Sequence, residues 1–294
     1  MTKRRLTHLG LLGLVAAAAA CGGRADDDPV FARPSLTVSR QRVALGSPVD
    51  ITYSFVVSQA APAVQGDFRV FVHVLADDGE QMWTDDHEPP TPVTAWKPGE
   101  TVSYTRTVFV PIYPYVGEAS VNVGIYDIKG GTRLKLEGAD SGQREYKVAT
   151  FQILPQTENI FLIYKDGWHQ PEVAPDNAQA QWQWTRGEGT LTFRNPRRDV
   201  LLYLHVDGRA PFAAGPQTVT VRVSGQPVDT FALEKPGEVL RRVPLTAAQL
   251  GGGNTVELRI GVDRTFVPAS VPGSGSKDAR ELGVRVFHAF VEPR

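Results

Sequence analysis

The segment TVSYTRTVFV, which runs from Thr101 to Val110, alternates bulky, mostly apolar side chains with threonine and serine. Successive side chains of a β-strand point to opposite faces of its sheet, so this period of two predicts a strand with one buried and one hydrated face. The alternation holds until Phe109, an aromatic residue at a position where the pattern calls for a polar one. The segment therefore favours a sheet that packs one face against a core, as in a β-sandwich.

Similar segments, bounded by Gly, Pro, Asn and Asp, recur about every ten residues and predict an all-β chain. In the first half we expect strands at Leu36–Arg40, Val49–Val57, Phe68–Leu75, Gln81–Thr84, Thr101–Val110, Ala119–Asp127, Arg133–Leu136 and Tyr146–Ile153. In the second half we expect them at Gln181–Thr185, Gly189–Arg194, Leu201–Val206, Gln217–Val223, Val228–Leu233, Val239–Val243, Thr255–Val262 and Leu282–Val291. Only Thr246–Leu250 favours a helix, a single turn with Thr246 as N-cap and Gly251 as its end.

Near the amino terminus, the basic residues 3–5 precede the apolar run Leu9–Ala20. As a helix this run would span ~18 Å at about 1.5 Å per residue, while the hydrocarbon core of a bilayer is ~30 Å thick. The run is thus too short for a transmembrane helix. Its pattern favours a cleaved signal peptide.

The apolar run ends in Ala18-Ala19-Ala20-Cys21, and Cys21 is the only cysteine of the chain. This ending resembles the lipobox of a bacterial lipoprotein. The resemblance implies cleavage before Cys21, followed by acylation of its thiol and of the new amino group with fatty acids such as palmitate. The membrane would then be a partner through the lipid anchor on Cys21, and the protein would lie outside the cytoplasm. Gly22 stands where an aspartate would signal inner-membrane retention, which favours the outer membrane. A signal peptide beside an incidental cysteine is the alternative.

The 294 residues exceed a typical single domain and suit two. We expect a signal peptide at 1–20, a lipidated flexible tether at 21–33, a first sandwich at 34–154 and a second at 155–294. The tether is rich in glycine and aspartate. Because a single cysteine excludes an internal disulfide, each sandwich has to be stable through its apolar core alone.

The formal charge of the chain is −1, and removal of the leader makes it more acidic. Nucleic-acid binding needs clustered positive charge, so this balance argues against a nucleic-acid partner. No motif for a cofactor was identified either, and we expect none.

Two groups of segments resemble known bacterial modules. The first resembles an Ig-like sandwich of extracytoplasmic proteins and of the ends of some membrane glycosyltransferases, and it comprises Phe68–Leu75, Asp78-Gly79, Asp85-Asp86-His87, Trp96–Glu100 and Val123–Asp127. The second is similar to a sandwich found beside polysaccharide-assembly enzymes, and it comprises Gly167-Trp168, Trp182–Thr185 and Asp278–Val284. The resemblance implies an Ig-like domain followed by a jelly-roll-like, carbohydrate-binding-like domain in the cell envelope. It implies no transferase activity, because the chain has no glycosyltransferase domain.

Asp85, Asp86 and His87 form the densest group of candidate metal ligands. Loop oxygens suit Ca²⁺, and a histidine suits a transition metal. Neighbouring strand residues, however, point to opposite faces, so the interpretation we favour is structural, with an aspartate capping a turn and His87 bonded to the adjacent strand. We expect no metal.

Catalytic motifs are lacking. The segment 272–276, PGSGS, has no glycine two residues before Ser274 and therefore does not form a nucleophile elbow. Paired carboxylates for glycoside hydrolysis need only meet in space, so a hydrolase remains an open but weakly supported alternative. We expect no enzyme activity.

The tryptophans give the strongest functional signal. Trp168, Trp182 and Trp184 lie near the start of the second half, and Trp182 and Trp184 share one face of their strand. Such rings form either an exposed platform for sugar rings or a packed patch, and packing is the commoner outcome. Asp263, Asp278 and Arg280 would add a polar corner, in which an ion-pair network that pins the loop is favoured over a catalytic pair.

These patterns together predict a non-enzymatic, membrane-anchored envelope lipoprotein that binds or scaffolds a ligand through β-sandwich domains. A polysaccharide is one candidate ligand. The alternative is an accessory subunit that docks a protein of an envelope polysaccharide or secretion assembly.

Overall fold

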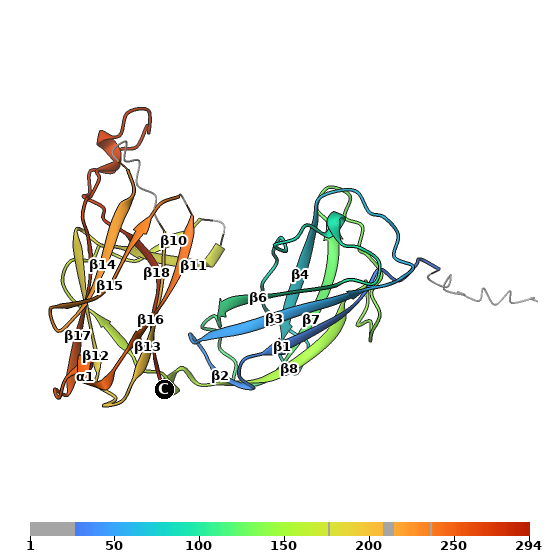
Figure 1. Cartoon of the computed structure of the whole chain (residues 1–294), viewed down its shortest axis with the longest axis horizontal. Helices are drawn as coiled ribbons and strands as arrows, with labels where there is room; N and C mark the ends of the chain where they lie inside the picture. Colours follow the sequence, from blue (N-terminus) through green and yellow to red (C-terminus); the bar gives the residue numbers. More distant parts are fainter. Residues whose placement is uncertain (1–26, 176, 208–214, 236) are drawn as a thin grey trace, which may run out of the picture.

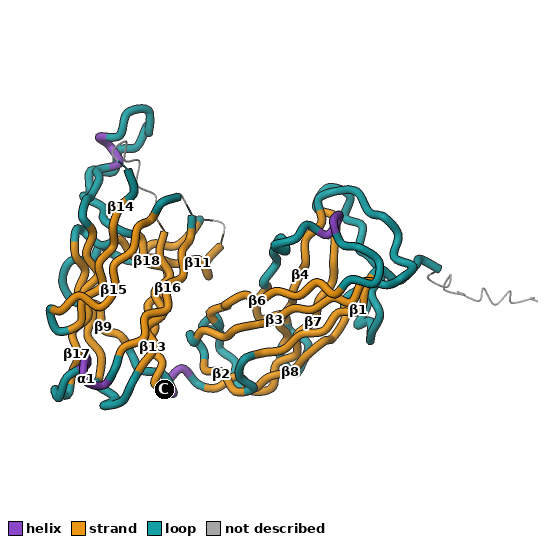
Figure 2. Tube along the Cα trace, in the orientation of Figure 1, coloured by secondary structure: helices purple, strands orange, loops and turns teal. Residues whose placement is uncertain are grey.

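A computed structural model describes residues 27–175, 177–207, 215–235 and 237–294. Within these ranges the regular secondary structure is almost entirely β-strand, as predicted (Figures 1 and 2). The strands of the first half are β1 (Ala32–Val38), β2 (Arg42–Ala44), β3 (Pro48–Val57), β4 (Phe68–Leu75), β5 (Gln81–Thr84), β6 (Thr101–Phe109), β7 (Gly117–Asp127) and β8 (Tyr146–Leu154). Those of the second half are β9 (Leu162–Tyr164), β10 (Glu172–Ala174), β11 (Asn177–Trp184), β12 (Glu188–Arg194), β13 (Val200–Asp207), β14 (Gln217–Val223), β15 (Gln226–Leu233), β16 (Glu238–Leu245), β17 (Thr255–Val262) and β18 (Arg285–Pro293).

The first sandwich consists of a three-stranded sheet, β1-β3-β6, and a five-stranded sheet, β2-β8-β7-β4-β5. Side chains from both sheets form one apolar core, in which Tyr53 and Phe55 of β3 and Ile153 of β8 are almost fully buried. The alternation of TVSYTRTVFV predicted this arrangement, because it left β6 one face for the core and one for solvent.

The second sandwich consists of two five-stranded sheets, β10-β11-β18-β13-β16 and β15-β14-β17-β12-β9. Its core is a separate apolar cluster that includes Phe193, Leu204 and Ile260. The predicted all-β fold with sandwich domains is confirmed. The short helix α1 (Ala247–Leu250) is also present, and Thr246 caps it in a capping box with Gln249.

The structure differs from the expected strands in a few places. Residues 133–136 form isolated bridges rather than a strand. The first strand begins earlier than expected, at Ala32, inside the range assigned to the tether, because Phe31 and Ala32 are buried in the first core. The three-residue strands β2, β9 and β10 were not expected, since three residues are too few to show a period.

The two halves touch through Phe109, the residue that breaks the alternation of β6. Its ring stacks on His288 of β18, with ring centroids 4.1 Å apart and planes at 12°, and it lies 6.1 Å from the ring of His205 on β13. Ion pairs between Arg40 and Glu292, and between Arg242 and Asp50, flank this contact. Figure 1 shows the two halves side by side, joined by the segment after β8.

The contact buries the imidazole rings. Burial, together with the neighbouring His205, lowers the pKa of His288 to about 3, and burial also lowers the pKa of His205 despite the Glu238 carboxylate 3.0 Å from its Nε2. Phe109 faces both rings from β6, while Tyr203 and Asp207 lie on β13, the strand of His205. Both rings are therefore neutral at neutral pH.

We predict that acid weakens this region. The unfolded histidines take up protons near pH 6.5 while folded His288 does not, so the stabilisation is fully present above pH 6.5 and is lost as the pH falls toward 3. The loss is about 1.4 kcal/mol per pH unit for one such histidine. Urea unfolding at pH 7, 5.5 and 4 measures it, and His288→Gln should show a shallower dependence than the wild type. Equal slopes for the two proteins would contradict the prediction.

Candidate functional site

A cleft of about 330 Å³ in the second sandwich brings together four of the residues singled out in the sequence. We call it the tryptophan cleft, and it is lined by Glu172, Trp182, Trp184, Phe266, Pro268, Ser276, Asp278, Arg280, Leu282 and Arg285. Strands β10, β11 and β18 form one side of it, and the long connection from β17 to β18 forms the other. The site thus joins residues that are more than 100 positions apart in the sequence.

The aromatic wall consists of Trp182 and Trp184, which share one face of β11. Trp184 is 6% exposed and packs against Phe266, with ring centroids 5.8 Å apart, whereas Trp182 is only half-buried. The guanidinium of Arg285 lies 5.0 Å from the ring centroid of Trp182 and 5.8 Å from that of Trp184. Trp184 therefore supports the wall, and Trp182 presents ring surface to the cleft.

Arg285 is a buried charge. Its side chain is 8% exposed and forms an ion pair with Asp207, whose side chain is 4% exposed. The pair joins register partners on β18 and β13. A buried charge is tolerated when it is paired and hydrogen-bonded, and here it also lies against aromatic faces. The pair fixes Arg285 against the rings of the cleft.

The polar wall is organised by Arg280. Its Nε and Nη2 donate to the two oxygens of Asp278 at 2.9 and 2.7 Å, and its Nη1 donates to Oε1 of Glu172 at 2.7 Å. The other oxygen of Glu172, Oε2, accepts the indole N–H of Trp182 at 3.3 Å. One guanidinium thus fixes two carboxylates beside the half-buried indole.

These hydrogen bonds set the ionisation of the site. The bonds from Arg280 lower the pKa of Asp278 to about 2, against the opposing effect of burial, and they raise the pKa of Arg280 itself. Asp278 is consequently ionised at any physiological pH. It can only accept hydrogen bonds, and both of its oxygens accept them from Arg280.

Two of the sequence candidates lie elsewhere. Trp168 is 9% exposed, packs in the second core and donates its indole N–H to the carbonyl of Thr190 at 2.9 Å. A Cβ on Gly189 would lie 2.5 Å from this ring, so the glycine makes room for it. Asp263 directly follows β17 and accepts the backbone N–H of Thr218 at 2.8 Å, and it does not line the tryptophan cleft.

The sequence analysis did not single out Glu172 or Arg285. Glu172 lies on a strand of three residues, too short to be recognised. Arg285 begins a largely apolar strand, and its partner Asp207 ends another. A charged residue at the end of a largely apolar strand could have marked each of them as unusual. Their pairing, however, depends on the register between β18 and β13, which the sequence does not show.

Asp85, Asp86 and His87 form a structural network in the first sandwich. Asp85 accepts hydrogen bonds from Tyr53 at 2.9 Å and from Nε and Nη2 of Arg106 at 3.0 and 2.8 Å. Asp86 accepts the backbone N–H of Val72, as expected of a residue that caps backbone groups.

His87 completes this network. Its Nδ1 lies 2.6 Å from the carbonyl of Asp85 and its Nε2 2.7 Å from the hydroxyl of Tyr104, and burial lowers the pKa of the ring. Throughout the described residues, no three His, Cys, Asp or Glu side chains are grouped so as to hold a metal ion.

Cys21 and the leader lie outside the described residues. Among the residues that are described, none of the helices has the length and apolar character needed to cross a bilayer.

No family model and no curated protein sequence matches the chain. Solved structures give distant similarities. SGBP-B from a complex xyloglucan utilization locus in Bacteroides uniformis is 13% identical, with a TM-score of 0.35 over 90% of this chain and 74% of that one. A carbohydrate binding module from Cellvibrio mixtus lichenase 5A, in complex with cellotriose, is 13% identical, with a TM-score of 0.27 over 46% of this chain and 98% of the module.

A 4-O-methyl-alpha-glucuronidase with specificity for decorated arabinogalactans is 11% identical, with a TM-score of 0.33 over 55% of this chain. The match covers only 20% of the glucuronidase. With all three TM-scores below 0.5, these similarities identify neither a family nor a ligand for this chain.

For the Asp85 network we predict a structural role. Asp85→Ala leaves the Arg106 guanidinium and the buried Tyr53 hydroxyl without their acceptor, so it should lower the free energy of unfolding by about 2–3 kcal/mol. Asp86→Ala, which removes one bond to a backbone N–H, should cost about 1 kcal/mol. Urea unfolding with and without Ca²⁺ measures both. A stabilisation by Ca²⁺ that disappears in Asp85→Ala would instead indicate a metal site.

Proposed function

We propose that the chain binds a carbohydrate at the tryptophan cleft and does not chemically change it. The observation that carries this proposal is the placement of the half-buried Trp182 ring beside two carboxylates that Arg280 holds in fixed positions. A sugar ring has apolar C–H faces and a rim of hydroxyl groups. An aromatic surface next to fixed hydrogen-bond acceptors matches both features.

Glu172 retains acceptor capacity for a ligand. A carboxylate has about four lone-pair sites. Asp278 uses both of its oxygens twice, for the guanidinium and the backbone N–H of Arg280. Glu172 uses one oxygen for Arg280 and one for Trp182, which leaves further lone pairs for hydroxyl donors. Because the positions of these groups are fixed before binding, little side-chain entropy is lost when a ligand arrives.

The protonation of the cleft favours binding over hydrolysis. Glycoside hydrolysis needs a carboxylic acid that is protonated at working pH. The low pKa of Asp278 removes it from that role. In addition, Arg280 bridges Asp278 to Glu172, so a positive charge lies between the two groups that a hydrolase would need to use separately.

We also propose that the protein is anchored to a bacterial membrane, outside the cytoplasm, through an acylated Cys21. The resemblance of Ala18-Ala19-Ala20-Cys21 to a lipobox supports this placement. An anchor confines the cleft to a thin layer beside the membrane and raises its effective concentration toward envelope polysaccharide. Several acyl chains contribute about 0.8 kcal/mol per buried CH₂, which suffices for stable attachment.

We predict that Trp182→Ala weakens carbohydrate binding about tenfold or more, because the variant loses the ring surface that contacts the sugar. A glycan array followed by titration calorimetry measures the effect. Phe231→Ala is the matched control, since Phe231 is also half-buried under an arginine, with the Arg241 guanidinium 4.8 Å from its ring centroid, but lies on β15 away from the cleft. Unchanged affinity in Trp182→Ala, or no binding by the wild type, would refute the proposed function.

We predict that Cys21→Ser releases the protein from the membrane fraction of its bacterial host, because serine has no thiol to acylate. Fractionation with immunoblotting, together with mass spectrometry of the amino terminus, tests this. Retention of the variant in the membrane fraction would overturn the anchor and leave the carbohydrate proposal in place.

A further inference from the structure

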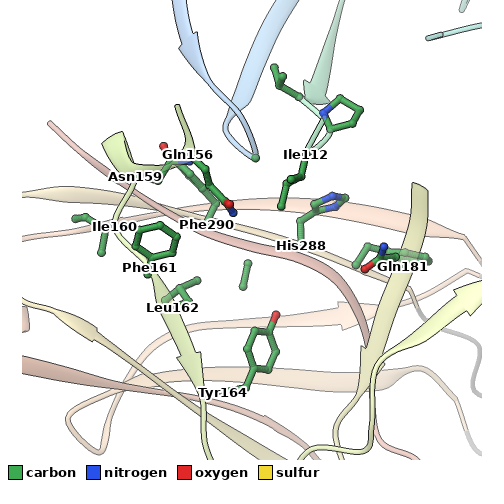
Figure 3. Close-up of a pocket in the computed structure, with 15 residues that line it drawn as sticks. Ile112, Gln156, Asn159, Ile160, Phe161, Leu162, Tyr164, Gln181, His288 and Phe290 are labelled. Atoms are coloured by element: carbon green, nitrogen blue, oxygen red, sulfur yellow. The ribbon is translucent and has the colours of Figure 1, made fainter. Parts of the chain in front are cut away.

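A second cleft, of about 460 Å³, lies between the two sandwiches (Figure 3). We call it the inter-sandwich cleft. Gly46 and residues 110–112 of the first half line it, as do Gln156 and residues 159–162 after β8, and residues 287–290 of β18. Its volume lies in the range of small-molecule sites, about 300–1,000 Å³, and such sites occur preferentially between domains.

Large apolar side chains are exposed around this cleft. Ile112 is 69% exposed, Phe161 53% and Tyr164 37%. Figure 3 shows all three around the same cavity, although they come from different parts of the chain. Apolar surface in contact with water costs about 25 cal/mol per Å², so an occupant that covers these side chains would gain free energy.

Hydrogen-bonding groups lie among these apolar side chains. The amides of Gln156 and Gln181 line the cleft, and Figure 3 shows them on different sides of it. In addition, the described pairing of β18 with β11 comprises Arg285 and Val286, and residues 287–290, which line the cleft, lie beyond it. Covering polar groups with an acyl chain, which makes no hydrogen bonds, costs free energy, so the amides favour a ligand with hydroxyl groups.

The lining carries no formal charge. None of the described residues around the cleft is Asp, Glu, Lys or Arg. His288 is neutral at neutral pH because its burial lowers the pKa of the ring. An anionic ligand would lose its hydration without gaining a counter-charge. The tryptophan cleft, in contrast, contains four charged side chains.

From this geometry we propose that the inter-sandwich cleft is a second saccharide site, which takes an uncharged sugar unit and contacts both sandwiches at once. The inference rests on the proposed function for its class of ligand, but it concerns different residues. Phe287 links the two places: it lines the inter-sandwich cleft, and its ring centroid lies 6.2 Å from that of Trp182. An occupant that touches Ile112 as well as Phe161 resists separation of the two halves.

Hydrogen exchange tests this proposal locally. The full chain, purified in detergent, is incubated with cellohexaose, xylohexaose and β-1,4-galactohexaose as neutral probes and with hexagalacturonate as an anionic probe. At least one neutral probe should slow amide exchange in residues 156–164 by threefold or more, and hexagalacturonate should not. Ile112→Arg should abolish this protection, because it places a bulky charge in the cleft. Val116→Arg is the matched control, since Val116 is 53% exposed in the same half and does not line the cleft.

The outcomes separate the two proposals. Protection of 156–164 that persists in Trp182→Ala but not in Ile112→Arg supports the second site independently of the first. Binding that depends on Trp182 with no protection of 156–164 keeps the proposed function and overturns this inference. Equal protection by hexagalacturonate would contradict the claim that the site takes only uncharged sugars. A lack of binding by every probe would overturn both proposals.

Discussion

Each sheet of this protein has to bury one apolar face, and a chain with a single cysteine cannot add the stability of an internal disulfide. The apolar residues of β3 and β13 are buried against facing sheets, and this burial stabilises both sandwiches. The constraint applies to one face only. The opposite faces and the strand ends are free to carry other groups, and Trp182 and Phe109 occupy such positions. The proposed binding site is therefore built from residues that the cores do not use.

The sequence predicted the longer strands well because their side chains follow the pleat of a half-buried sheet, as in β6 and β14. It also brought Trp182 and Asp278 to notice, since tryptophans and an Asp-x-Arg pattern are visible locally. It did not predict Glu172, whose strand of three residues has no period, or the Arg285–Asp207 pair. That pair forms through the register of β18 with β13, and register between distant strands is decided by the packing of whole sheets.

Buried charge is used differently in the two halves. In the first sandwich, Asp85 binds Arg106 and the hydroxyl of Tyr53, so the carboxylate is committed to groups of the protein itself. In the second, Arg285 is paired with Asp207 and lies against the tryptophan rings, while Arg280 holds its carboxylates at the cleft surface. A network that is satisfied internally rigidifies a fold. A network held at the edge of a cleft still has lone pairs to offer, which is why the second one, and not the denser Asp85–His87 group, carries the proposed function.

The contact between the halves is centred on Phe109. Its ring contacts with His288, His205 and Tyr203 hold two independent cores beside each other, together with two flanking ion pairs and the hydrogen bonds of Asn159 with Ser47 and Leu45. Partly exposed ion pairs contribute about 0–1 kcal/mol each, so the ring contact and the connecting segment carry much of the orientation. The same neutral imidazole lines the uncharged cleft. A protonated His288 would bring an unpaired cation into both places at once, so the geometry of the interface and the preference of the cleft for uncharged ligands depend on the same low pKa.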